Sequence, residues 1–151
     1  MSDPIMVYNL LNEIFILLDD GDRHLLSQFN LSIPRYYVLV HLGNEPGLSL
    51  SRLSELMICD KSNATRIIRG METEGLVRRK RHESDGRTYR LYLTEKGETL
   101  RQKATQAHYA YTVERLTCCQ TINLDTLKKG LIEIRDNLKV SLETLKQQTS
   151  D

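Results

Sequence analysis

The sequence of 151 residues has no tryptophan, only three cysteines, and no apolar run near the roughly 20 residues that cross a membrane. The cysteines, Cys59, Cys118 and Cys119, lack paired C-x-x-C spacing and are odd in number, which argues against a disulfide framework or a structural zinc site. We therefore expect reduced thiols. An acidic residue, Asp3, stands where a signal peptide carries its positive region, so we expect a cytoplasmic chain.

Sequence motifs of enzymes are also missing. There is no G-x-S-x-G nucleophile motif, no glycine-rich phosphate loop and no pair of histidines at metal-ligand spacing. His24 and His41 could bind a metal ion or an effector across a helix interface, but isolated histidines are more often structural. We therefore expect no enzyme activity, no cofactor and no resident metal.

The basic residues are concentrated in one part of the chain. A composition of 40% hydrophobic and 27% charged residues is typical of one globular domain, and the net charge is only +1. However, residues 61–93 hold 9 Lys and Arg against 4 Asp and Glu, whereas residues 1–60 hold 3 against 8. Such a basic segment is expected of a protein that binds a polyanion, although a solvated charged face gives the same excess of Lys and Arg over Asp and Glu.

Helical periodicity appears before the basic segment. Asp3 followed by Pro4 predicts the start of a long first helix, which Gly21 could bend or fray. Pro34 can open a second helix that ends before the turn-forming residues 43–47. A short third helix should follow, with a serine cap and an inward apolar face: Ser49 or Ser51, then Leu53, Leu56 and Met57.

Residues 60–75 predict an amphipathic helix with a polar face suited to contacts. Asp60 is a natural N-cap, and apolar side chains recur at helical spacing to form a buried stripe: Ala64, Ile67, Ile68 and Met71. The opposite face carries hydrogen-bonding side chains: Ser62, Thr65, Arg66, Arg69 and Thr73. A short helix followed by this one is the helix-turn-helix plan, in which the second helix enters the major groove of DNA, although a plain solvated helix has the same pattern.

A β-hairpin is predicted after this helix. Gly75 ends the helix, Leu76 begins a strand, and "SDG" at 84–86 provides the turn. The second strand has one apolar face: Tyr89, Leu91 and Leu93. Because an isolated hairpin is marginal, it should pack on the helices and project its tip outward. At this tip the Asp85 carboxylate can hold the Arg87 side chain in an extended conformation. A narrow minor groove of DNA would accept a guanidinium presented in this way.

Several short motifs occur together in residues 53–97. They are the Ser-Glu-Leu of the third helix, Lys-Ser-x-x-Thr-Arg of the fourth, Met-Glu-x-x-Gly-Leu-Val-x-Arg, the Asp-x-Arg of the hairpin tip, and Leu-x-Leu-Thr-x-Lys-Gly. Each alone would be weak, but together they resemble the winged helix-turn-helix core of the MarR family of bacterial transcription regulators. The order of the flanking helices fits the remainder of that family.

The resemblance implies a mainly α fold with a small β-hairpin wing, in a single domain over 1–151. The winged helix-turn-helix part would be 34–93, flanked by dimerisation helices at 3–30 and 94–148. The implied function is that of a sequence-specific regulator, a homodimer on a pseudo-palindromic operator of double-stranded DNA, and a repressor that responds to a small-molecule effector.

The residues that we expect to contact DNA come from the fourth helix and the hairpin. Those of the helix are Lys61, Ser62, Asn63, Thr65, Arg66 and Arg69. Those of the hairpin are Arg78, Arg79, Lys80, Arg81, Asp85, Arg87 and Arg90. Arg66 and Arg69 are placed for guanine edges or adjacent phosphates, whereas the cations of the first strand should act as a sequence-independent field.

Two more helices are predicted after the hairpin. Thr94 caps the first of them, which carries Leu100, Ala104, Ala107 and Tyr111, and Asn123 caps the second. The second has leucines seven apart with apolar residues between them: Leu124, Leu131, Leu138 and Leu145, with Leu127 and Ile134. Such a heptad seam favours a partner helix, so we expect both termini to form a homodimer, although packing within one chain would also bury the seam.

Alternatives remain for the effector and for the function. His24, Tyr36 and Tyr37 could line a pocket for a small phenolic or other anionic ligand, although a tyrosine pair is more often core. A thiol-based redox sensor is an alternative because Cys59 lies beside the recognition helix and two cysteines stand at 118–119. The peroxide-sensing branch of the family carries its reactive cysteine early in the first helix, where this chain has none. A protein-interaction module without DNA contact is the other alternative.

Overall fold

The computed structural model describes residues 3–84, 88–117 and 121–149. Contacts within the chain divide it into two compact units, Met1–Thr112 and Val113–Asp151, where the sequence alone predicts one domain. Within the described ranges, no helix combines the length and the apolar character that a membrane span requires.

The first unit contains the helices that surround the hairpin. They are α1 (Pro4–Ser27), α2 (Ile33–Asn44), α3 (Leu50–Leu56), α4 (Lys61–Thr73) and α5 (Glu95–Thr117), of which the last extends into the second unit. The predicted caps of α1 and α4 are confirmed, because Asp3 accepts a hydrogen bond from the Ile5 amide at 2.9 Å and Asp60 accepts one from the Asn63 amide at 2.8 Å. The first helix runs on through Gly21, so this glycine does not end it.

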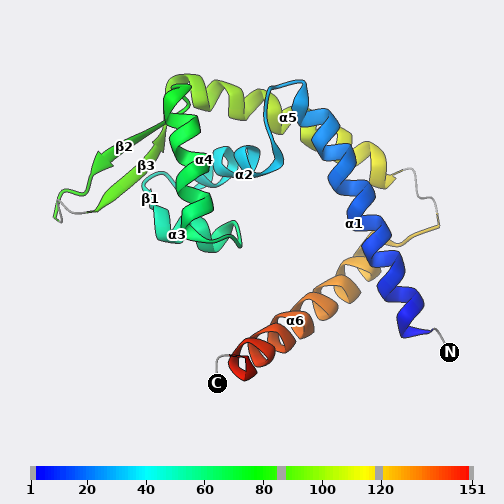
Figure 1. Cartoon of the computed structure of the whole chain (residues 1–151). Coiled ribbons are helices and arrows are strands. Elements are labelled where there is room, and N and C mark those ends of the chain that lie inside the picture. The colour runs from blue at the N-terminus through cyan, green and yellow to red at the C-terminus, as the bar shows by residue number, and fades with distance from the viewer. Residues whose placement is uncertain (1–2, 85–87, 118–120, 150–151) are drawn as a thin grey trace. The chain divides into compact units, whose positions relative to one another are not determined.

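A three-stranded antiparallel sheet completes the first unit, with strand order β1-β3-β2. Its strands are β1 (Leu48–Ser49), β2 (Val77–Arg81) and β3 (Tyr89–Leu93). The last two form the predicted hairpin, which projects away from α4 (Figure 1). The short β1 was not predicted. It pairs Leu48 with Leu91, and the Gly47 amide before it donates to the Leu91 carbonyl at 2.9 Å.

The hydrophobic core lies between the helices and one face of the sheet. Its largest fully buried side chains come from both layers: Leu26, Val38, Leu39, Leu42, Leu53, Ile68, Met71 and Leu91. The predicted stripe of α4 is buried at Ala64, Ile68 and Met71 and partly buried at Ile67. Tyr89 does not anchor the hairpin as expected, because it is 44% exposed and stands beyond the end of the core. Leu91 and the partly buried Leu93 hold the hairpin on the helices.

The N-terminus of α5 clamps the turn between α4 and β2. The Thr94 hydroxyl donates to the Gly75 carbonyl at 2.6 Å, and the Lys96 ammonium donates to the Glu74 carbonyl at 2.8 Å. Thr94 also accepts a hydrogen bond from the Gly97 amide at 3.0 Å, which confirms Thr94 as the cap of α5. The end of α4 and the start of the hairpin therefore share one support.

Both the start of α1 and the whole of α6 leave apolar side chains exposed. In the second unit, α6 (Leu124–Gln148) is capped by Asn123, which accepts a hydrogen bond from the Thr126 amide at 2.9 Å. The predicted heptad positions are all exposed: Leu124, Leu127, Leu131, Ile134, Leu138 and Leu145. In the first unit, most apolar residues of α1 between Ile5 and Leu18 are exposed as well. Neither apolar surface is covered within its own unit.

Candidate nucleic-acid interface

The first turn of α4 presents polar side chains that hydrogen bonds hold in place. The Asp60 carboxylate accepts bonds from the Ser62 hydroxyl at 2.5 Å and the Asn63 amide at 2.8 Å. These bonds lower the pKa of Asp60 below its ordinary 3.8, so the cap is ionised at neutral pH. The Thr65 hydroxyl donates to the Lys61 carbonyl at 2.7 Å. Both hydroxyl oxygens keep acceptor capacity, and the Lys61 side chain is exposed.

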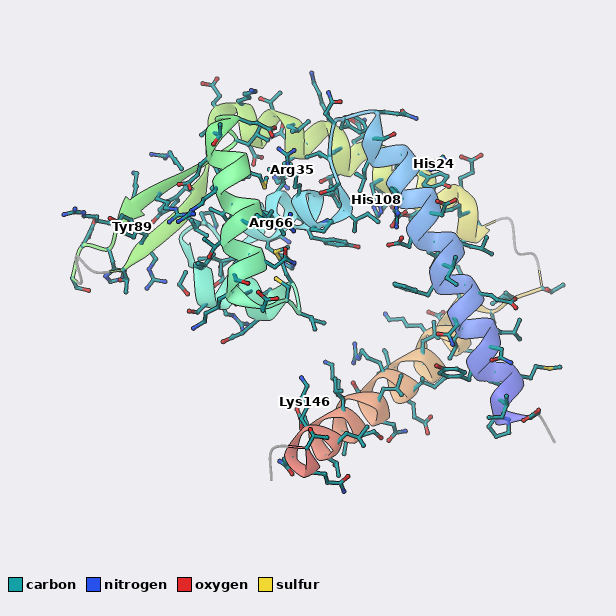
Figure 2. All side chains as sticks on the ribbon, viewed as in Figure 1. His24, Arg35, Arg66, Tyr89, His108 and Lys146 are labelled. Carbon is teal, nitrogen blue, oxygen red and sulfur yellow. The ribbon has the colours of Figure 1, made fainter. Side chains whose placement is uncertain are left out.

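Arg66 and Arg69 lie on the exposed face of α4, opposite the buried stripe, as the periodicity predicts. Figure 2 marks Arg66 on this helix. Its guanidinium donates to the side-chain oxygen of Asn63 at 2.8 Å, which orients it along the helix. That bond uses one of several N–H donors, so the remainder can meet acceptors on a ligand.

A hollow of about 300 Å³ lies beside Arg66, between the start of α2 and α4. Its lining includes Arg35, which bonds Glu74 at 2.5 Å, and Gly70, where a side chain would point into open space. Sequence reasoning missed both residues. An arginine in the first turn of a helix opposes the helix dipole, and a glycine inside a helix weakens it, so each could have signalled an unusual surface.

The strand register sorts the cations of the hairpin between the two faces of the sheet. Arg79 stands opposite buried Leu91 on the core face, and its Nε lies 2.9 Å from a carboxylate oxygen of Glu72 in α4. This ion pair corrects the expectation that Arg79 adds free positive charge to the field. The face that the helices leave uncovered carries Arg78, Lys80 and Arg90.

The far end of the hairpin carries the other predicted contacts. Arg81 is exposed and stands opposite Tyr89, which Figure 2 marks on the hairpin. Asp85 and Arg87 lie outside the described residues, so the predicted orientation of Arg87 by Asp85 stays a prediction.

Ion pairing places most of the described arginines in two groups. Those that bind a carboxylate are spread over the chain: Arg23, Arg35, Arg52, Arg79, Arg101 and Arg135. Within the described ranges no carboxylate partner is found for the second group, which is Arg66, Arg69, Arg78, Arg81 and Arg90. Every member of this group lies on α4 or on the hairpin. Among the described residues, the arginines that have no carboxylate partner are therefore concentrated on these two elements.

The residues predicted to line an effector pocket differ from one another in burial. Tyr36 is buried, and its ring packs against the rings of Tyr37 and His108 with centroid distances of 5.4 and 5.0 Å. Burial raises the pKa of both tyrosines above 10.0, so both stay neutral. The His24 side chain is exposed, and its Nδ1 lies 3.9 Å from Oδ1 of Asp20. The burial of Tyr36 and its ring contacts give it a packing role in the core.

Cys59 occupies the turn between α3 and α4. Its side chain is partly exposed, and its amide donates to the Ser54 carbonyl at 3.1 Å. Cys118 and Cys119 lie outside the described residues, so a thiol switch that involves them stays a prediction.

Comparison with known proteins gives a consistent result. The sequence model of the MarR family matches residues 31–89. The organic hydroperoxide resistance transcriptional regulator of Bacillus subtilis (strain 168) is 35% identical over 82 residues, which are 54% of this chain and 56% of that protein. AbsC, a MarR family transcriptional regulator from Streptomyces coelicolor, superposes with a TM-score of 0.82 at 28% identity, over 92% of this chain and 97% of its own.

A third protein, FabT of Streptococcus pneumoniae, was solved in complex with DNA. It superposes with a TM-score of 0.80 over 91% of this chain and 98% of its own, at 21% identity, which shows the fold alone. The chain spans 56% and 58% of the length of the first curated relatives that it matches. In its motifs, in its winged helix-turn-helix fold and in the family model that matches residues 31–89, the chain is therefore similar to the MarR family, whose members are transcriptional regulators and not enzymes.

Proposed function

We propose that this chain is a DNA-binding transcriptional regulator that reads its operator with the exposed face of α4. The observation that carries the proposal is the distribution of unpaired arginines. Six arginines, including Arg79 on the core face of the hairpin, bind carboxylates, whereas among the described residues no carboxylate partner is found for the other arginines of α4 and the hairpin. Cations left unneutralised on two adjacent elements match the phosphates of a duplex.

The details of α4 support base reading by its N-terminal half. Lys61 opens the helix next to the Asp60 cap, and its exposed side chain supplies a positive charge that can meet a phosphate. Ser62 and Asn63 are at contact length for base edges or phosphates. Arg66, held by Asn63, can reach the paired acceptors of a guanine in the major groove. FabT, a protein of the same fold, was solved in complex with DNA, which supports DNA binding by this fold.

Arg66→Ala tests the proposed base contact. On a duplex selected by the protein from a random-sequence pool, the variant should lose about 1–3 kcal/mol of binding free energy and lose its preference at one position per half-site. On random duplex the loss should be smaller. Arg23→Ala is the matched control, because Arg23 is exposed on α1 and binds Asp19. Equal losses of Arg66→Ala on both duplexes would reduce Arg66 to a phosphate contact.

The proposal includes a homodimer on a pseudo-palindromic operator. Its support is the apolar surface that α1 and α6 expose, because large exposed apolar surfaces are typical of interaction sites. Leu138, on the heptad seam, is 62% exposed. Leu138→Asn should therefore weaken the dimer, whereas Lys139→Asn, beside the seam, should not. Sedimentation equilibrium measures both, and a folded wild-type monomer at micromolar concentration would contradict the dimer.

The proposal also includes repression that a small effector relieves. Of the residues predicted for its pocket, Tyr37 is 41% exposed and the His24 side chain 80% exposed, so both are accessible, whereas Tyr36 is not. With 4-hydroxybenzoate as the probe, release of operator DNA should be lost in Tyr37→Ala and retained in Tyr109→Ala, an exposed tyrosine of α5. Release that is equal in both variants would place the effector elsewhere.

A further inference from the structure

A hollow of about 640 Å³ lies where the end of α4 meets the start of α5 (Figure 1). Its lining comes from three segments, which are the connection between α1 and α2, the turn after α4, and the first turns of α5. The volume is in the range of small-ligand sites. None of the lining residues belongs to the aromatic cluster of Tyr36, Tyr37 and His108, so the hollow is a separate place on the molecule.

The floor of the hollow is apolar. Phe29 and Leu100 line it, are partly buried, and pack against the hydrophobic core. Leu76 also lines the hollow and is buried. The core therefore holds these side chains in place. Such a floor favours a ligand with an apolar side chain, because contact removes apolar surface from water on both sides.

Charges of opposite sign lie at the two ends of the hollow. At the start of α5 the lining holds two acids and one lysine, Glu74, Glu95 and Lys96. Arg35 binds the Glu74 carboxylate at 2.5 Å, and the Lys96 ammonium donates to the Glu74 carbonyl at 2.8 Å. Lys103 lies about two turns farther along α5. Within the described residues, no ion-pair partner is found for Glu95 or for Lys103. One end therefore offers an open carboxylate and the other an open ammonium.

The distance between these two charges limits the length of a ligand that meets both. Glu95 and Lys103 are eight positions apart, which corresponds to about 12 Å along the helix axis. A single amino acid is too short, because its ammonium and carboxylate are attached to the same carbon. An extended chain of three residues places its terminal ammonium and carboxylate about 10 Å apart. The flexible side chains of glutamate and lysine can cover the difference.

Two further polar side chains line the hollow, Asn30 before α2 and Thr99 on α5. Thr65 and Thr73 each donate to the carbonyl four residues earlier in their helix. Within the described part of the chain, no hydrogen bond is found for the Thr99 hydroxyl or for the side-chain amide of Asn30, and both residues are exposed. A hydroxyl and an amide can each donate to and accept from peptide groups. The hollow therefore has partners for a peptide backbone between its charged ends.

We propose that this hollow binds a short peptide of about three residues, with free termini and an apolar central side chain. The ammonium of the peptide lies at Glu95, and its carboxylate lies at Lys103. Its central side chain covers the apolar floor. A ligand of this kind differs in chemistry and in place from the phenolic effector that is proposed for the surface around Tyr37.

Calorimetric titration of the full-length protein with four tripeptides tests each part of the site. The first is Ala-Leu-Ala with free termini. N-acetyl-Ala-Leu-Ala lacks the ammonium, Ala-Leu-Ala amide lacks the carboxylate, and Ala-Gly-Ala lacks the apolar side chain. We expect Ala-Leu-Ala to bind wild type, and each of the other three peptides to bind about fivefold more weakly.

Two variants assign the charged ends. In Glu95→Gln, acetylation of the peptide should no longer weaken binding, whereas amidation still should. In Lys103→Gln, amidation should no longer weaken binding, whereas acetylation still should. Because each variant keeps its response to the other modification, a loss caused by misfolding is recognised. Glu114→Gln and Lys129→Gln are the matched controls, which should behave as wild type because both residues are exposed and lie outside the hollow.

Failure of Ala-Leu-Ala to bind wild type would overturn the proposal. Binding that neither acetylation nor amidation weakens would also overturn it, because the apolar floor alone would then account for the affinity. Equal weakening of all four peptides in Glu95→Gln and in Lys103→Gln would count against the assigned ends. Loss of Ala-Leu-Ala binding in Tyr37→Ala would place the peptide at the aromatic cluster instead. Since the titrations contain no DNA, their outcome is independent of the proposed function.

Discussion

The α carbon of Gly97 in α5 packs directly against the backbone carbonyl of Leu76, at the entrance to the hairpin. A Cβ at Gly97 would lie 2.0 Å from the Leu76 oxygen, closer than any real contact allows. The Leu76 carbonyl also accepts a hydrogen bond from the Thr94 amide at 3.0 Å. Movement of the start of α5 away from Leu76 would therefore break this hydrogen bond. This contact fixes α5 to the segment that joins α4 to the hairpin.

Gly97→Ala should therefore destabilise the protein, against the ordinary preference of helices for alanine. Overpacking of this kind costs about 1–3 kcal/mol, and a clash with backbone leaves little room for relaxation. Urea unfolding at neutral pH measures the change. A stability equal to or above that of wild type would show that α5 can shift away from Leu76.

Gly70→Ala in α4 should have the opposite effect on stability. No atom lies within 4 Å of the Cβ that it would add, so the usual gain of about 0.5–1 kcal/mol for alanine in a helix interior should be observed. The new methyl group would enter the hollow beside Arg66, so operator affinity should decrease while the melting temperature increases. Unchanged affinity would show that DNA does not approach α4 at this point.

The sequence predicted most of the first unit because its signals are local. Asp3, Asp60 and Asn123 are caps that act within one turn, and the buried stripe of α4 follows from helical spacing. The second strand was predicted from alternation, but not β1, because a strand of two residues has no periodicity. Its only support is pairing with β3, which depends on the tertiary fold.

The candidate site was predicted less completely, since ion pairs between distant residues leave no sequence pattern. Arg79 stands next to Arg78 in the sequence, yet only Arg79 reaches Glu72, because alternation along the strand turns it toward α4. Arg35 and Gly70 were missed for the same reason, as the hollow that they share joins residues from two helices. For Tyr36 the sequence left a pocket role and a core role open, and the structure buries it in the core.

Replacement of Ile58 by glycine should stabilise the protein. It occupies the turn between α3 and α4 at φ 51°, a left-handed conformation that β-branched residues disfavour, and its side chain is 91% exposed. Ile58→Gly should relieve this strain and stabilise the protein by about 1 kcal/mol. The melting temperature provides the measurement. A decrease would mean that the isoleucine makes contacts, for instance in the dimer, that outweigh the strain.

His41 should make stability depend on pH. Burial lowers its pKa below the ordinary 6.5, so the unfolded chain binds a proton at a pH where the folded chain does not. Stability should therefore decrease as the pH falls from about 7.5 through 6.5, and level off below the folded pKa. In His41→Gln this part of the pH dependence should vanish, while it persists in His24→Gln, whose side chain is exposed. Urea midpoints between pH 5 and 7.5 compare the three proteins, and parallel curves would rule out His41 as the source.

Methylation interference on the selected operator tests the central claim most directly, namely that two copies of α4 read the major groove. Methylation of guanine N7 blocks the major groove, and methylation of adenine N3 blocks the minor groove. We predict that N7 methylation interferes at symmetric guanines about one helical turn apart, and that Arg66→Ala removes the interference at one guanine in each half-site. Interference confined to adenine N3, or a pattern with no symmetry that Arg66→Ala leaves unchanged, would contradict the account.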